Sequence, residues 1–121
     1  MPVYVSGWAE HLLREYFGQC GILEDSMRQI QGLPLELSRR LGMDVSFWER
    51  VLSNPDSRFH RLNLLDGAIE KVVRQAEENA RMYGRGICHY LGEALYRQSF
   101  LNWVANYLRA MFEAEGYERL L

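Results

Sequence analysis

The segment from Leu62 to Tyr83 limits the possible folds most strongly, because its apolar residues recur at every third or fourth position. Five residues carry this pattern: Leu65, Ile69, Val72, Ala76 and Ala80. Such spacing places them on one face of an α-helix, whereas a half-buried strand would alternate apolar and polar residues. The segment therefore predicts one long amphipathic helix whose apolar face packs on the rest of the chain.

A similar pattern from Ile87 to Glu115 predicts a second long helix, joined to the first through Gly84-Arg85-Gly86. Two long helices with so short a connection should lie antiparallel. Alternation typical of a strand occurs only in Pro2 to Val5, so we expect an all-α fold. We expect a single domain, with a compact head of short helices in residues 1–57 and a long antiparallel helical hairpin in residues 58–121.

Three features of the head are predicted from capping and turn signals. A first helix should begin at Ser6 as N-cap and end before Gly18, and a short helix should run from about Leu23 to Ile30. The segment 53–57, Ser-Asn-Pro-Asp-Ser, is the strongest turn signal in the chain. It separates the head from the predicted hairpin.

Within the head, the segment Pro34 to Ser53 has the spacing of two short helices joined at a sharp corner. Leu37 and Leu41 would be buried on the first helix, and Ser38 is small where the second helix should cross. Gly42 can adopt a positive φ, and the residue after it, Met43, would be an apolar plug. On the second helix, the apolar positions that should be buried are Trp48 and Val51.

From about Glu24 to Val73, this pattern resembles the helix-turn-helix of small bacterial and phage repressors of the lambda-repressor-like kind. The matching residues are Gly32-Leu33, then Leu37 to Met43, with Ser46 near the start of the next helix. The resemblance implies a DNA-binding regulator that acts as a homodimer on double-stranded DNA. It implies major-groove contacts from Ser46, Phe47, Glu49 and Arg50, and phosphate contacts from Arg39, Arg40, Arg58 and Arg61. A corner that serves packing alone would satisfy the same pattern.

Charge is distributed unevenly along the chain, although the net charge of −2 gives no general attraction to phosphate. Residues 1–27 contain four acidic residues and one arginine, whereas residues 28–61 contain six arginines and four acidic residues. The most basic third therefore coincides with the helix-turn-helix segment, although charge clustering of this size also occurs on ordinary solvated surfaces.

The last predicted helix is rich in aromatic residues, which are spread too widely around it for one narrow stripe. Four of them are candidates for a dimer or partner surface, because tyrosine and tryptophan are enriched at protein interfaces: Tyr96, Phe100, Trp103 and Tyr107. Alternatively, the helix crosses the whole domain and is buried nearly all round.

No catalytic or metal-binding constellation is evident, so we expect no enzymatic activity, no cofactor and no small-molecule substrate. Cys88 and His89 are adjacent and would point about 100° apart on a helix, which prevents them from sharing a metal. With only Cys20 and Cys88 in the chain, we expect two buried thiols and a reducing compartment. Neither a membrane span nor a secretory signal is apparent, so the predicted location is cytoplasmic.

Two hypotheses remain for a non-enzymatic binding protein. The first is the homodimeric DNA-binding transcriptional regulator. The second is an inhibitor, adaptor or chaperone, from a bacterium, phage or mobile element, whose aromatic C-terminal helix covers a protein partner. Removal of Arg50 would distinguish them, because only DNA affinity should depend on it.

Overall fold

A computed structural model describes residues 7–116, with only the backbone of Glu115 included. This part of the chain contains helices and no strand, which confirms the all-α prediction. In chain order the elements are α1 (Gly7–Leu12), the π-helical turn η1 (Leu13–Phe17), α2 (Leu23–Gln31), α3 (Leu33–Leu41), α4 (Val45–Ser53), α5 (Arg58–Arg61), α6 (Leu64–Tyr83), α7 (Ile87–Tyr96) and α8 (Ser99–Glu115). The expected N-cap Ser6 and the segment Pro2 to Val5 lie outside the described residues.

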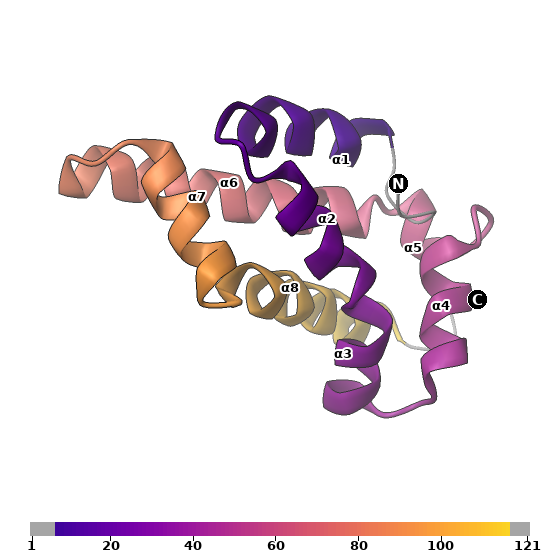
Figure 1. Ribbon diagram of the computed structural model, residues 1–121. Coiled ribbons are helices and arrows are strands. Elements are labelled where there is room, and N and C mark those ends of the chain that lie inside the picture. The colour runs from indigo at the N-terminus through magenta and orange to yellow at the C-terminus, as the bar shows by residue number, and fades with distance from the viewer. Residues whose placement is uncertain (1–6, 117–121) are drawn as a thin grey trace.

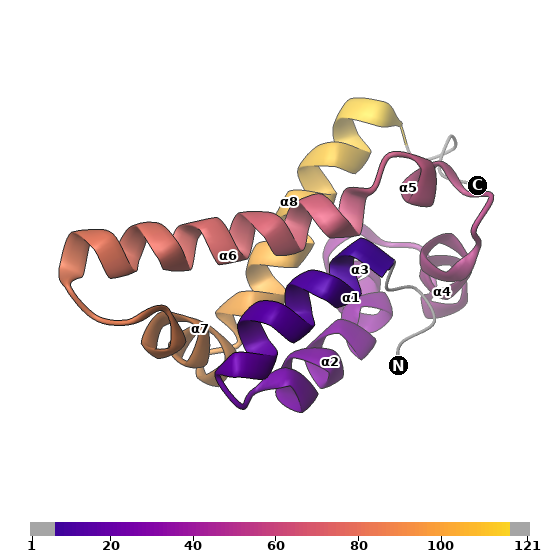
Figure 2. The ribbon, with the colours of Figure 1, turned by 90° about the horizontal axis from the view of Figure 1, so that it is seen from above.

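The long helix α6 is the centre of the arrangement (Figures 1 and 2). It packs against α8, α7 and α1, and α3 packs against both α4 and α8. Helices α3 and α4 lie together at one end of the molecule, and the α6–α7 connection lies at the other (Figure 1). The corner and the C-terminal end of the long helix α6 therefore lie at opposite ends of the molecule.

Large aromatic side chains join the head to the C-terminal helix in one core. Phe17 of η1 contacts Phe100 of α8, with ring centroids 5.2 Å apart. The Trp48 ring of α4 stacks on Phe112 of α8 at 5.3 Å. All four side chains are fully buried. Because the same helix supplies both partners, the head and the C-terminal part cannot form separate hydrophobic cores.

The predicted second long helix is wrong, because the chain breaks between Tyr96 and Ser99. Gln98 has a φ of 56°, and α7 and α8 run in different directions on either side of it (Figure 1). The buried residues Leu95 and Phe100 are five positions apart, which is about 140° out of phase on a straight helix. The break lets both side chains reach the core. It also replaces the expected hairpin of two long helices with a bent arrangement of three.

Helices α6 and α8 approach closely at Gly67. A Cβ atom at this position would lie 2.5 Å from the hydroxyl oxygen of Tyr107, well inside van der Waals contact. The absence of a side chain at Gly67 therefore leaves the space in which the Tyr107 ring of α8 packs against α6.

Candidate functional site

The corner between α3 and α4, residues 33–53, is closed by hydrogen bonds that cross the turn. The Ser38 hydroxyl donates to the Met43 carbonyl at 2.8 Å, and the Trp48 indole donates to the Gly42 carbonyl at 2.7 Å. Asp44 caps α4 by accepting from the Phe47 amide at 2.7 Å. Gly42 has a φ of 84°, as its place in the pattern required. Two short helices thus meet at a corner with a positive φ at Gly42, as the spacing of Leu37, Ser38 and Gly42 predicts.

Met43 does not act as the expected apolar plug, since 57% of its side chain is exposed. The Trp48 ring is fully buried beneath the turn instead. A large ring that both fills this space and bonds to the turn leaves no room for a second plug.

The four residues predicted to contact the major groove differ in their exposure to solvent. Ser46, Glu49 and Arg50 are exposed on α4, whereas Phe47 is half-buried. The Phe47 ring packs edge-on against Trp48, with centroids 5.0 Å apart. Phe47 therefore supports the core more than the outer face of α4.

The four arginines predicted to contact phosphates also differ in their exposure to solvent. Arg39 and Arg61 are exposed. Arg40 forms an ion pair with Glu36 at 2.6 Å and donates to Asn106 at 2.7 Å and to Asn102, so it fastens α3 to α8. Arg58 is half-buried, with its Nε atom shielded from solvent. Arg40 and Arg58 thus correct the sequence interpretation, because both are part of the packed structure.

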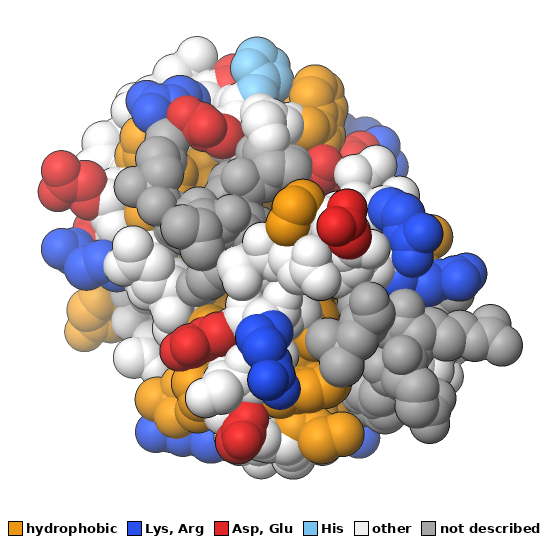
Figure 3. Space-filling model, turned by 90° about the vertical axis from the view of Figure 1, so that its right-hand side faces the viewer, with side chains coloured by type: hydrophobic (Ala, Val, Ile, Leu, Met, Phe, Trp, Pro, Cys, Tyr) orange, Lys and Arg blue, Asp and Glu red, His pale blue; other side chains and the backbone are white. Residues whose placement is uncertain are grey.

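The face that carries α4 and α5 shows no continuous basic surface among the described residues. Figure 3 presents this side of the molecule, and lysine or arginine side chains are interspersed there with aspartate, glutamate and apolar groups. Asp44 and Glu49 add two exposed acids to α4 itself. Such a surface attracts a phosphate backbone weakly, because nucleic-acid binding draws much of its free energy from clustered cations.

The four aromatic candidates do not form one surface. Phe100 is fully buried against Phe17, so its assignment to an interface was wrong: the side chain faces the core after the α7–α8 break. Tyr107 is half-buried against α6. Tyr96 is 89% exposed at the end of α7, and Trp103 is 41% exposed on α8. Tyr96 and Trp103 are the most exposed of the four, and they line different hollows.

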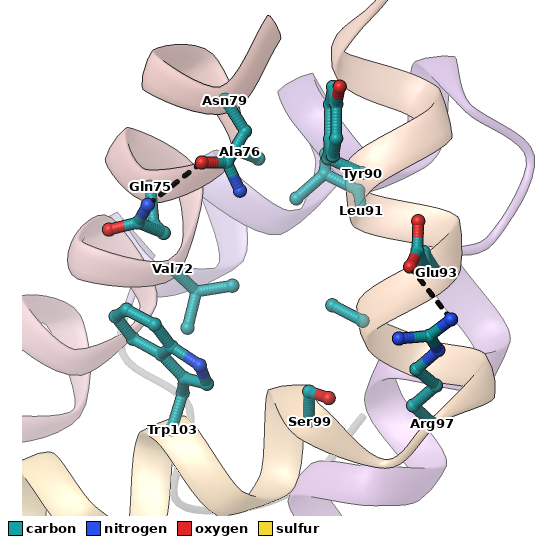
Figure 4. A pocket seen from close by; sticks show the side chains of 11 residues that line it. Val72, Gln75, Ala76, Asn79, Tyr90, Leu91, Glu93, Arg97, Ser99 and Trp103 are labelled. Atoms are coloured by element: carbon teal, nitrogen blue, oxygen red, sulfur yellow. Dashed lines mark hydrogen bonds and ion pairs between the residues drawn. The ribbon is translucent and has the colours of Figure 1, made fainter. Parts of the chain in front are cut away.

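Trp103 belongs to an open cavity of about 300 Å³ between α6, α7 and α8, called the cleft below. Its lining is mixed, with apolar, amide, hydroxyl and charged side chains from all three helices: Val72, Gln75, Ala76, Asn79, Tyr90, Leu91, Glu93, Ala94, Arg97, Ser99 and Trp103. Figure 4 shows α6 and α7 as the two walls and the start of α8 between them, with the Trp103 ring beneath Val72.

Four polar side chains of the cleft are paired along their own helices. Gln75 donates to Asn79 at 3.0 Å along α6, and Arg97 pairs with Glu93 at 3.2 Å along α7. His89 also lies 3.2 Å from Glu93. Each of these contacts joins residues four positions apart, and none of them crosses the cavity (Figure 4).

The sequence interpretation overlooked the cleft, although α6 carries a signal for it. The apolar face of this helix has large residues at Leu65 and Ile69 and small ones at Ala76 and Ala80. Small side chains cannot fill the space between diverging helices. This change in side-chain size predicts that packing loosens toward the C-terminal end of α6, where the cleft lies.

Cys20 and Cys88 form a disulfide, which corrects the prediction of two buried thiols. Their Cα atoms are 5.2 Å apart and their positions are separated by 68 residues. Cys88 is exposed and Cys20 is half-buried. The prediction of a reducing compartment rested on free thiols, and the disulfide removes this argument. The cytoplasmic location stays a prediction.

Within residues 7–116, no group of three or more histidine, cysteine, aspartate and glutamate side chains is placed to hold a metal ion. In the same part of the chain, no helix combines the length and apolar character needed to cross a membrane. Comparison with known proteins gives no match to a family model, to a curated protein or to a solved structure.

Proposed function

We propose that this chain is a small non-enzymatic binding protein that holds a segment of a partner protein in the cleft. The observation that carries the proposal is the convergence of Trp103, Tyr90 and Arg97 on one open cavity of about 300 Å³. Tryptophan, tyrosine and arginine are the residue types most enriched among the side chains that dominate binding energy at protein interfaces.

The pairing of polar groups also supports this proposal. Hydrogen bonds and ion pairs between residues four apart on a helix contribute only about 0.2–0.5 kcal/mol each. Gln75, Asn79 and Arg97 can therefore exchange their present bonds for bonds to a ligand at little cost. The same exchange at Arg40 would break the side-chain bonds that join α3 to α8.

The cavity suits one bulky apolar side chain with polar main chain on either side of it. Its volume is at the lower end of the range for small-molecule sites, about 300–1,000 Å³. An aromatic or large aliphatic side chain would lie against Trp103, Val72 and Leu91, and main-chain amides of the same segment would face the Gln75–Asn79 pair. We therefore expect a peptide segment with a single large apolar anchor.

Selection of a random peptide library on the oxidised protein tests this function. Selected peptides would be titrated by fluorescence anisotropy against the wild type, Trp103→Ala and Tyr96→Ala. Tyr96 is the matched control, because it is an exposed aromatic residue of the neighbouring helix that lies outside the cleft. We expect Trp103→Ala to weaken binding by tenfold or more and Tyr96→Ala to leave it within about twofold.

Two results would contradict the proposal. One is a selection that gives no peptide above background. The other is a set of peptides that lose affinity on Tyr96→Ala and keep it on Trp103→Ala, which would move the binding surface to the outer face of α7.

DNA binding through the corner is the second candidate, favoured by the hydrogen-bonded turn between α3 and α4 and by exposed Ser46, Glu49 and Arg50 on α4. In this alternative, a homodimer would place two α4 helices in successive major grooves. Arg50 would then supply the only bidentate contact to guanine from the outer face of α4.

Anisotropy of labelled random duplex DNA at two salt concentrations tests this alternative, with light scattering to give the molar mass. Binding by a dimer that weakens steeply with salt, and that falls on Arg50→Ala but not on Arg97→Ala, would support it. Absence of binding at low salt would exclude it.

A further inference from the structure

Helix α7, which forms one wall of the cleft, lies between two joints with left-handed backbone. At its N-terminal side, Gly84 has a φ of 78° and the non-helical residues Gly84 to Gly86 connect it to α6. At its C-terminal side, Gln98 has a φ of 56° and begins the turn into α8. A ten-residue helix between two such joints depends on lateral contacts to hold its position.

Helix α7 packs on α6 and α8 and has fewer contacts with η1. Its side chains Ile87, Tyr90 and Ala94 are partly buried against the core. Leu91 and Leu95 are the buried side chains of α7. The Gln29 side chain of α2 donates to the Leu95 carbonyl at 2.8 Å, close to the C-terminal end of the helix. The ion pairs of Glu93 join it to other residues of α7 and so do not tie the helix to its neighbours.

At the other end of α7, the covalent contact is the Cys20–Cys88 disulfide. Cys88 is the second residue of the helix, and Cys20 lies in the turn after η1. Tyr90 and Leu91, which line the cleft, follow within one turn of Cys88. The disulfide therefore adds a covalent tie to the turn after η1 at the end of α7 opposite the Leu95 contact.

We infer that this disulfide is a redox-sensitive tether that sets the position of the α7 wall and thereby controls partner binding in the cleft. The control of binding rests on the function proposed above, whereas the tethering of α7 stands independently of it. In the oxidised protein the cleft is formed and binds its peptide. In the reduced protein, the N-terminal half of α7 moves away from the turn at Cys20 and peptide affinity falls.

A dithiol reductant provides the chemistry. Its thiolate attacks Sγ of Cys88, the exposed member of the pair, and the S–S bond breaks as Cys20 leaves as a thiolate that takes up a proton. The second thiol of the reductant then attacks the mixed disulfide and releases Cys88. Two electrons pass to the protein, which ends as a dithiol, and the reductant ends as a cyclic disulfide.

Amide hydrogen exchange of the full chain, oxidised and after treatment with dithiothreitol, tests the tether directly. We expect residues 87–96 to exchange at least about tenfold faster after reduction, because local opening of an untethered segment requires less free energy. Amides of α4, which lies at the far end of the molecule, serve as the internal control and should keep their protection (Figure 1). Reoxidation should restore the slow exchange.

A peptide selected on the oxidised protein is then titrated against both redox forms, and we expect its affinity to fall by tenfold or more on reduction. Unchanged exchange in residues 87–96 would overturn the tether. Loss of protection throughout the chain, α4 included, would also overturn it, because the disulfide would then hold the whole fold.

Faster exchange in α7 with unaltered peptide affinity would refute the control of binding alone. If no peptide is found, the proposed function fails, while the exchange measurement still decides on the tether.

Discussion

The corner and the cleft differ in where their polar side chains form bonds. At the corner, Ser38 and Trp48 bond across the turn, and Arg40 bonds to a different helix. In the cleft, Gln75 and Arg97 bond to residues four positions away on their own helices. Bonds between elements define the fold, so their loss is costly, whereas bonds within one helix can be exchanged for a ligand. This difference favours the cleft over the corner as the binding surface.

The largest expected effect is the difference in stability between substitutions of Trp48 and Trp103. Trp48→Ala should lower the free energy of unfolding by about 3–5 kcal/mol, because a fully buried ring and its stacking on Phe112 are lost. Trp103→Ala should lower it by less than about 1 kcal/mol, since much of that side chain is exposed. Urea denaturation followed by circular dichroism measures both. Equal losses would mean that Trp103 belongs to the structural core, which would contradict its role as a binding residue.

A smaller difference in stability is expected between substitutions of Arg40 at the corner and Arg97 in the cleft. Arg40→Ala should cost about 1–3 kcal/mol of unfolding free energy, because Asn102, Asn106 and Glu36 lose their shared partner. Arg97→Ala should change stability by less than about 0.5 kcal/mol, since its ion pair lies on the surface. The same denaturation experiment measures the two variants. If Arg40→Ala proved neutral, the arginine would be free to contact a phosphate, and the DNA-binding alternative would gain strength.

The smallest effect concerns the side of α6 that does not line the cleft. The negative charge of Glu77 raises the pKa of Tyr16, with burial and Glu15 as further causes. Glu77→Gln should therefore lower this pKa toward its ordinary value. Absorbance titration of tyrosinate, with Tyr16→Phe to identify the signal, measures the change.

The raised pKa of Tyr16 determines how the stability of the fold changes with pH. As pH rises through the ordinary range of tyrosine, the unfolded chain loses this phenolic proton first, so folding becomes less favourable. Glu77→Gln should reduce this alkaline loss of stability. Identical pH profiles for the variant and the wild type would show that η1 and α6 are not in electrostatic contact.

The corner could be predicted from sequence because its determinants are local. Leu37, Ser38 and Gly42 lie within six residues of one another. Their spacing predicts a short helix, a close approach of the next helix at Ser38 and a positive φ at Gly42. The break before α8 was also within reach, since Leu95 and Phe100 are out of helical phase. The segment nevertheless predicts one uninterrupted helix, because apolar residues such as Leu91, Leu95 and Leu101 recur along it without a glycine or proline at the break.

The cleft and the disulfide could not be predicted in the same way, because both depend on how distant segments meet. No local pattern brings Cys20 to Cys88 across 68 positions. The walls of the cleft come from α6 and α7, whose relative direction is set at the joints around Gly84 and Gln98. Sequence spacing describes faces of single helices, and it does not give the angle at which two helices diverge.

The close approach at Gly67 has a consequence for the evolution and engineering of the cleft. Tyr107 and Trp103 are one turn apart on α8, so the contact of Tyr107 with α6 lies one turn from the residue that lines the cavity. A larger residue at position 67 would meet the hydroxyl end of the Tyr107 side chain, so this ring must move. We therefore expect substitutions at position 67 to alter the packing between α6 and α8 beside the cleft, from a residue that is not part of its lining.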